Sequence, residues 1–213
     1  MAKGRLEMII SHKHKFIFIK TRRTAGSSIE AALFPFLGPL DIITGSERDG
    51  TPRRNCSSNI TGHIGWRKII QLIGEETFWS YRVFCVERDP YAKVVSGYRW
   101  HAEHTKSFNG SLLDYVNQEK SISDWDRYTF DRQPVGKVFL FQDLINSPQL
   151  VLGLPVKFPH LKKTRTDDIC LDLDTTQAIK EKFSNEFKLL EVLRNDKKRS
   201  ADWNYARQNS GRS

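Results

Sequence analysis

Apolar residues gather in three short runs that predict buried strands, because the runs are rich in aromatic and β-branched side chains. They are Phe16–Ile19, 81–86 and 137–142, and a shorter strand is expected within 40–45. Between the runs, apolar residues recur at helical spacing. The predicted helices cover 64–78, 91–104, 112–119 and 175–194, and another begins with a capping serine at Ser27. Alternating strands and helices predict an α/β fold with a central parallel sheet covered on both faces.

Length and composition fit one globular domain. The chain has 213 residues, enough to bury a sizeable core, and we expect a single domain over 1–213 with a polar, basic tail from about residue 197. Its net charge of +9 predicts an anionic partner. A nucleotide, an acidic glycan, a nucleic acid and a membrane surface all satisfy that charge, so other features must distinguish them.

The sequence predicts a cytoplasmic protein without a membrane span. No stretch approaches the ~18 apolar residues that a spanning helix needs, and the first residues lack the apolar core of a signal peptide. The three cysteines are odd in number and widely spaced, so they indicate neither a metal site nor a disulfide framework. That usage favours a reducing compartment.

A basic turn follows the first predicted strand. It carries Lys20, Arg22 and Arg23, and Gly26 stands just before the predicted helix. Unpaired N–H groups and the dipole at a helix N-terminus favour a phosphate or sulfate, and glycine lets the backbone approach it closely. The alternative is a charged turn without a ligand. The turn is not a Walker A loop, because no glycine precedes Gly26 within it and no lysine follows.

A second charged turn, Arg88-Asp89-Pro90, follows the second strand. Pro90 suits the first turn of a helix, and Ser96 lies just over two turns into that helix. The guanidinium of Arg88 and the hydroxyl of Ser96 can hold one phosphate between them. Ligands of open α/β sheets lie beyond the carboxyl ends of the strands, so both turns should open on one edge. Alternatively, Arg88 pairs with a neighbouring carboxylate and Ser96 is a packed helix serine.

The two turns together resemble the nucleotide-binding loops of sulfotransferases that use 3′-phosphoadenosine-5′-phosphosulfate (PAPS), in particular the Golgi-type carbohydrate branch with glycosaminoglycan 2-O-type members. Arg88 and Ser96 match the family's 3′-phosphate site. The first turn departs from the family, which has proline where Arg22 stands and a catalytic lysine where Arg23 stands. The resemblance implies a P-loop NTPase-like fold, PAPS as cofactor and no metal. The residues that it implies for the 5′-phosphosulfate are Arg22, Arg23, Thr24, Ala25, Gly26, Ser27 and Ser28.

Two further segments agree with this resemblance. His63 stands in the region where the family has its proposed general base, and imidazole titrates near neutrality. The resemblance therefore implies His63 and Arg23 as catalytic residues, and Lys20 as a third that faces the acceptor. A surface histidine and a solvated charge run are the alternatives for these segments. The basic segment 160–166 resembles the family loop that closes over the cofactor and adds Lys162, Lys163, Thr164 and Arg165 to the implied cofactor contacts.

The sequence thus predicts transfer of a sulfuryl group from PAPS to a hydroxyl of a glycan or glycoconjugate. One alternative is a nucleotide- or glycan-binding protein of the same fold with impaired catalysis, because Arg23 is a poorer proton donor than lysine. A P-loop-related kinase or hydrolase is disfavoured by the missing Walker lysine. Nucleic acid is not expected as a partner, since only charge points to it.

Overall fold

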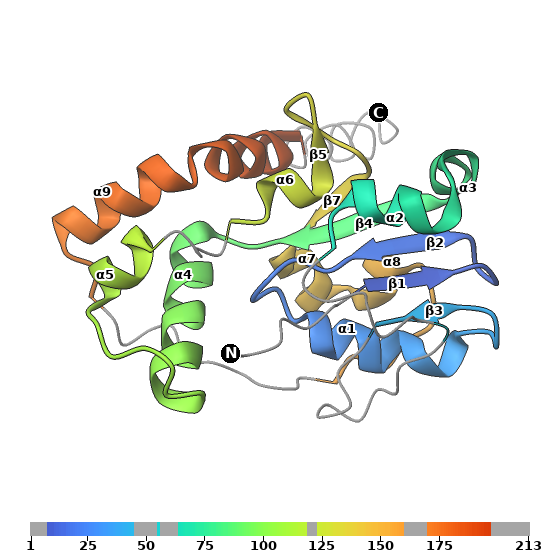
Figure 1. The fold of residues 1–213 in the computed structure, drawn as a ribbon, viewed down its shortest axis with the longest axis horizontal. Helices are drawn as coiled ribbons and strands as arrows, with labels where there is room; N and C mark the ends of the chain where they lie inside the picture. The colour runs from blue at the N-terminus through green and yellow to red at the C-terminus, as the bar shows by residue number, and fades with distance from the viewer. Residues whose placement is uncertain (1–7, 45–54, 56–63, 119–122, 160–169, 197–213) are drawn as a thin grey trace, which may run out of the picture.

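The computed structural model describes residues 8–44, 55, 64–118, 123–159 and 170–196 (Figure 1). At its centre lies a five-stranded mixed sheet with the strand order β3-β1-β2-β4-β7. The strands β2, β4 and β7 run parallel, whereas β1 pairs antiparallel with both β2 and β3. The strands are β1 (Met8–Ser11), β2 (Phe16–Ile19), β3 (Ile42–Ile43), β4 (Arg82–Glu87) and β7 (Lys137–Leu140).

The predicted strands are present, but the prediction of a parallel sheet is wrong at one edge. The sequence interpretation missed β1, which is only four residues long and fully buried. It forms a hairpin with β2 across residues 12–15, where Lys15 adopts a positive φ of 50°. So short a connection cannot carry the chain back for a parallel crossover, and the pair is therefore antiparallel.

The helices follow the predicted spacing but break at particular residues. The helix predicted over 64–78 is two helices, because Gly74 between them adopts a φ of 80°. The helix predicted over 175–194 is interrupted at Phe183, beyond which residues 184–196 are helical. The helices are α1 (Gly26–Leu33), η1 (Phe34–Phe36), α2 (Trp66–Ile73), α3 (Glu75–Ser80), α4 (Pro90–Arg99), α5 (Leu112–Asn117), α6 (Trp125–Tyr128), α7 (Phe141–Asn146), α8 (Pro148–Leu152) and α9 (Leu173–Lys182).

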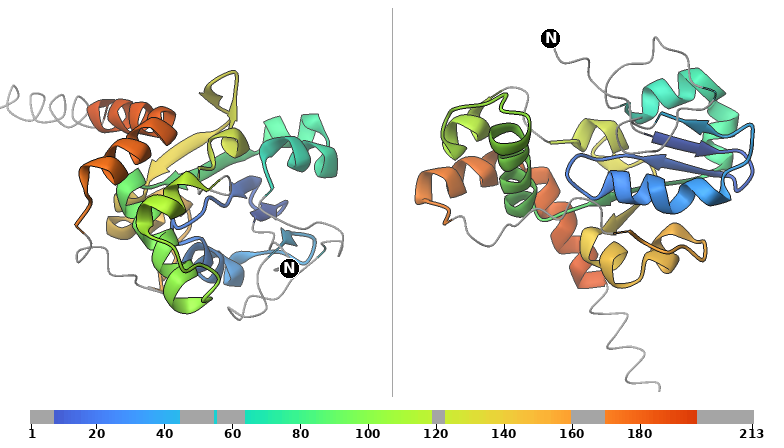
Figure 2. Two further views of the ribbon diagram at one scale, coloured as in Figure 1. Left: turned by 60° about the vertical axis from the view of Figure 1, so that its left-hand side comes forward. Right: turned by 90° about the horizontal axis from the view of Figure 1, so that it is seen from below.

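Helices cover both faces of the sheet (Figure 2). Because successive side chains of a strand point to opposite faces, Phe16 and Phe18 of β2 pack with α1, α7 and α8. Ile17 and Ile19 face the other side and pack with α2, α3 and α6. A separate hairpin of β5 (Thr129–Phe130) and β6 (Gln133–Pro134) follows α6.

A third apolar cluster joins α4, α5 and α9 beside the sheet (Figure 1). Val94, Tyr115, Val116, Ile179 and Phe183 form its buried centre. Because α4 begins directly after β4, this group of helices stands beyond the carboxyl end of that strand. It therefore faces the turn that follows the parallel neighbour β2.

Candidate functional site

The turn after β2 is anchored on the neighbouring strand. The Thr21 hydroxyl donates to the carbonyl oxygen of Val86 in β4, and the Thr24 hydroxyl donates to the Thr21 carbonyl over 2.9 Å. Arg23 and Ala25 both adopt a φ of 60°. Left-handed backbone is uncommon in residues other than glycine and tends to gather at functional sites. The basic turn is thus a defined structure held by its two threonines.

The helix α1 begins at Gly26, and its N-cap is Ala25, two residues before the serine that was predicted to cap it. The prediction that a serine caps this helix is wrong, because Ser27 and Ser28 lie inside its first turn. Alanine has no group that can satisfy the first amides of a helix. The N-cap residue of α1 therefore makes no side-chain hydrogen bond to the first turn of the helix.

Lys20 points into the protein interior, whereas the sequence led us to expect a side chain that faces the acceptor. Its side chain is only 4% exposed, and its Nζ lies 2.9 Å from Oε2 of the buried Glu30 in α1. A Cβ atom at Gly26 would lie 2.2 Å from Cε of Lys20. The glycine therefore makes room for the aliphatic part of the Lys20 side chain. Through its pair with Glu30, Lys20 connects the end of β2 to α1.

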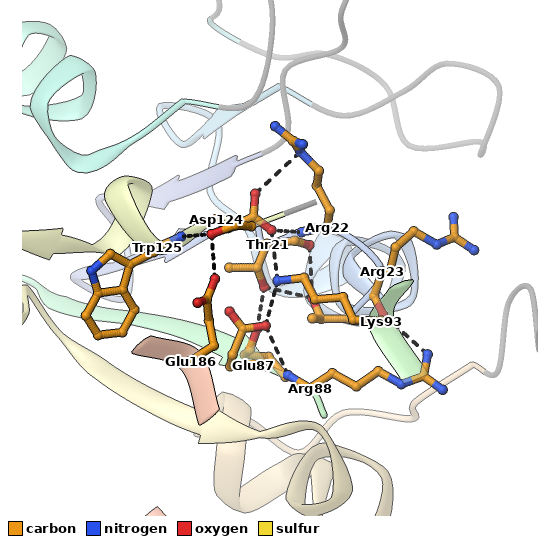
Figure 3. Close-up of polar contacts among 12 residues, drawn as sticks. Thr21, Arg22, Arg23, Glu87, Arg88, Lys93, Asp124, Trp125 and Glu186 are labelled. Carbon is orange, nitrogen blue, oxygen red and sulfur yellow. Dashed lines mark hydrogen bonds and ion pairs between the residues drawn. The ribbon is translucent and has the colours of Figure 1, made fainter. Parts of the chain in front are cut away.

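Arg22 is held by Asp124, a residue that the sequence interpretation missed (Figure 3). The backbone N–H of Arg22 donates to Oδ2 of Asp124 over 2.6 Å, and its Nε lies 3.4 Å from Oδ1. The Asp124 carboxylate is fully buried and also contacts Lys93 at 3.1 Å and Arg127 at 2.9 Å. Burial and the charge of Arg22 lower the pKa of Arg127 to about 10. One carboxylate thus gathers three cations behind the turn.

Lys93 connects the turn after β2 to the turn after β4. Besides Asp124, its Nζ contacts Oε1 of Glu87 at 2.7 Å, and the same oxygen accepts the backbone N–H of Arg88 over 3.1 Å. Burial alone would lower the pKa of Lys93, but the two carboxylates outweigh burial and raise it. The ammonium group therefore stays charged inside the protein and holds the two turns in register.

Arg23 brings the two predicted motifs together. Its Nε donates to the Ser96 hydroxyl over 3.0 Å, and its carbonyl oxygen accepts from Nη1 of Arg88 over 3.4 Å. Its guanidinium lies 5.2 Å from the ring centre of Trp100, a contact that the sequence did not predict. In Figure 3 the guanidinium of Arg88 points toward Arg23, whereas the side chains of Arg22 and Arg23 diverge.

The carboxylates next to Arg88 have other partners. Glu87 holds Lys93, while Asp89 caps α4 by accepting the N–H groups of Tyr91 and Ala92. The guanidinium of Arg88 instead lies 4.6 Å from the ring centre of Phe141. The alternative of a simple ion pair with an adjacent carboxylate is therefore not what the structure adopts.

Several predicted site residues lie outside the described part of the chain. They are His63, Lys162, Lys163, Thr164 and Arg165. A hollow of about 370 Å³ opens beside Asp124 rather than between Arg23 and Arg88. It is lined by Gly65, Arg67, Lys68, Ser123, Asp124, Asp126 and Arg127.

Among the described residues, no helix is long and apolar enough to cross a membrane.

Comparison with known proteins assigns no family to the chain. No family model matches it, and no solved structure matches it. An uncharacterised protein of Archaeoglobus fulgidus is 46% identical over 44 residues, which are 21% of this chain and 37% of that protein. The chain thus covers little more than a third of that relative, and the evidence for function rests on the site itself.

Proposed function

We propose that the protein is a sulfotransferase that moves a sulfuryl group from PAPS to a hydroxyl of a carbohydrate acceptor. The observation that supports this most is the meeting of two motifs that lie far apart in the sequence. Arg23 of the first turn contacts both Arg88 and Ser96 of the second. A nucleotide with phosphates at both ends of its ribose needs such a pair of adjoining anion sites.

The residues present fit that cofactor in charge and in donor type. Arg23, Thr24 and the backbone at the start of α1 would hold the phosphosulfate and stabilise the negative charge that develops there. Arg88 and Ser96 would hold the 3′-phosphate. When bound, PAPS supplies an activated sulfuryl group whose leaving group is a phosphate. His63 stays the sequence-based candidate for taking the acceptor proton.

A second candidate is a nucleotide- or glycan-binding protein of the same fold with impaired catalysis. The observation that favours it is the arginine at position 23, whose guanidinium stays charged and gives up a proton poorly. A sulfotransferase and a nucleotide-binding protein both bind the nucleotide, so only turnover distinguishes those two. A protein that binds only a glycan would bind no nucleotide.

Nucleotide binding tests the arrangement of the anion site. We expect calorimetry to show much tighter binding of adenosine 3′,5′-bisphosphate than of AMP, because only the former has a phosphate for Arg88 and Ser96. Arg88→Ala should weaken bisphosphate binding at least about tenfold, since a charge-assisted contact is typically worth ~1.5–3 kcal/mol. AMP binding should change little.

Arg67→Ala is the matched control, because it removes the same charge from an exposed position on α2. It should leave both affinities within about twofold. Equal affinity of the wild-type protein for the two nucleotides would reject the 3′-phosphate site and, with it, PAPS as the cofactor.

A further inference from the structure

The helix α4 continues into a π-helical turn, η3 (Trp100–His104), beside the anion site. Such turns are rare and occur frequently at functional sites. Two backbone hydrogen bonds close this turn. The N–H of Thr105 donates to the carbonyl oxygen of Trp100 over 3.0 Å, and the N–H of Ser107 donates to the carbonyl oxygen of His101 over 2.9 Å. The turn carries Trp100, on which the Arg23 guanidinium lies, and places His101 next to it.

A chain of hydrogen bonds orients the His101 ring. Nδ1 lies 3.0 Å from the Ser107 hydroxyl, which lies 2.6 Å from the Thr105 hydroxyl. Thr105 in turn donates to the carbonyl oxygens of His101 and Trp100, over 3.3 and 3.4 Å. Because a carbonyl oxygen only accepts, the Thr105 contacts favour a chain of donors that runs from Nδ1–H through Ser107 and Thr105. In that arrangement Nε2 of His101 carries the lone pair that a base requires.

The surroundings favour the neutral form of this imidazole. Burial lowers the pKa of His101, and the charges of Arg23 and Arg22 lower it further. The ring also packs against Tyr115, with ring centres 5.7 Å apart, and burial raises the pKa of the Tyr115 hydroxyl. Before a nucleotide binds, the ring thus lies in the positive field of Arg23 and Arg22 and against a neutral phenol. A bound polyanion would offset the two charges and make His101 a stronger base.

We propose that His101 is the general base that takes the proton of the acceptor hydroxyl, a step that rests on the proposed sulfotransferase function. The acceptor O–H bond breaks and its proton goes to Nε2 of His101. The acceptor oxygen forms a bond to sulfur. The bond between sulfur and the 5′-phosphate oxygen breaks, and the electron pair leaves on that oxygen. The imidazolium then gives its proton to solvent.

Turnover of three single variants with labelled PAPS tests this assignment. His101→Gln should lower kcat by about 10²–10⁴-fold, the usual contribution of a general base. Calorimetry should show that its affinity for adenosine 3′,5′-bisphosphate stays within about twofold. His104→Gln, on the same π-helical turn, is the matched control and should keep kcat within about threefold. His63→Gln shows whether the histidine favoured by the sequence resemblance carries the role instead.

The pH profile and the ring tautomer give readouts that a merely structural role would not move. Because the base must be unprotonated, wild-type kcat should rise with pH to a plateau, and the rising limb should vanish in His101→Gln. Imidazole ¹⁵N resonances should show the proton on Nδ1, and the pKa of His101 should rise when adenosine 3′,5′-bisphosphate is added.

The outcomes separate this inference from the proposed function. An active wild-type protein whose His101→Gln variant is equally active, or whose loss is seen only in His63→Gln, overturns the role of His101 alone. A ring with its proton on Nε2 overturns it as well. Absence of transfer by the wild-type protein to every acceptor rejects the proposed function and the inference together.

Discussion

Arg23 is the residue on which the chemistry of the proposed site depends most. Its Nε holds Ser96, its carbonyl oxygen holds Arg88, and its guanidinium lies on Trp100. A guanidinium carries five donors in a planar fork and stays charged at any relevant pH. Arg23 can therefore clamp a phosphosulfate and neutralise developing charge, although it cannot readily donate a proton.

Replacing Arg23 tests the catalytic role that we propose for it. Arg23→Ala should lower turnover more than a hundredfold, which is roughly the cost of deleting one donor that acts in the transition state. Arg23→Lys should keep or raise turnover, because it restores the residue of the family that the sequence resembles. Steady-state kinetics with labelled PAPS measures both. Normal turnover of Arg23→Ala alongside a folded but inactive Lys20→Ala would show that the catalytic cation had been misassigned.

The sequence predicted that the two turns lie close together but not every contact between them, for a physical reason. Arg23, Arg88 and Ser96 could be singled out because each stands at a fixed distance after a recognisable strand, and the structure brings them into contact. Asp124 could not, since its contact with Arg22 joins residues 102 positions apart and leaves no local signal. The role proposed for His101 also has no local sequence signal, because its ring contacts hydroxyl groups that only the π-helical turn brings to it.

At the scale of elements, the start of α1 rests on the buried pair of Lys20 and Glu30. Neither side chain is appreciably exposed, and the lysine stem fills the space that Gly26 leaves open. Removing one partner of a buried pair leaves an uncompensated charge, which typically costs about 3–5 kcal/mol. The pair therefore fixes the turn between β2 and α1 even though it touches no ligand in the proposed mechanism.

Denaturation by urea can test this supporting role. Lys20→Met should lower the free energy of unfolding by about 3–5 kcal/mol, and adding Glu30→Gln should recover most of it, because no buried charge then remains unpaired. Lys68→Met, at an exposed position on α2, is the control and should change stability little. A double variant that regains full stability but stays inactive would instead support the acceptor-facing role first expected for Lys20.

Element boundaries were predictable where side-chain pattern decides them and not where one backbone angle does. Phe16–Ile19 forms a strand as predicted, because its alternation serves two apolar layers. Gly74 divides a helix through its positive φ, which periodicity does not reveal. Residues 141 and 142 belong to α7 rather than to a strand. The predicted strand ran too far because Phe141 extends the apolar run of β7 into the first residue of the helix.

At the scale of the whole molecule, the sequence predicted the parallel centre of the sheet but not its antiparallel edge. The strands β2, β4 and β7 are each followed by a helix or a turn into one, so their parallel direction could be inferred. The strand β1 is paired through a hairpin whose signal is weak in a basic segment. The consequence for the proposed site is limited, because the two turns that we propose to bind anions follow β2 and β4, which are neighbouring parallel strands.

The measurement that tests the account most directly is transfer from labelled PAPS to a panel of glycans, without added metal. We predict that the wild-type protein labels at least one hydroxyl-bearing acceptor and releases adenosine 3′,5′-bisphosphate in equal amount, while Arg23→Ala does so more than a hundredfold more slowly. A wild-type protein that binds the bisphosphate tightly but labels no acceptor would contradict the central claim and leave the binding protein as the better account.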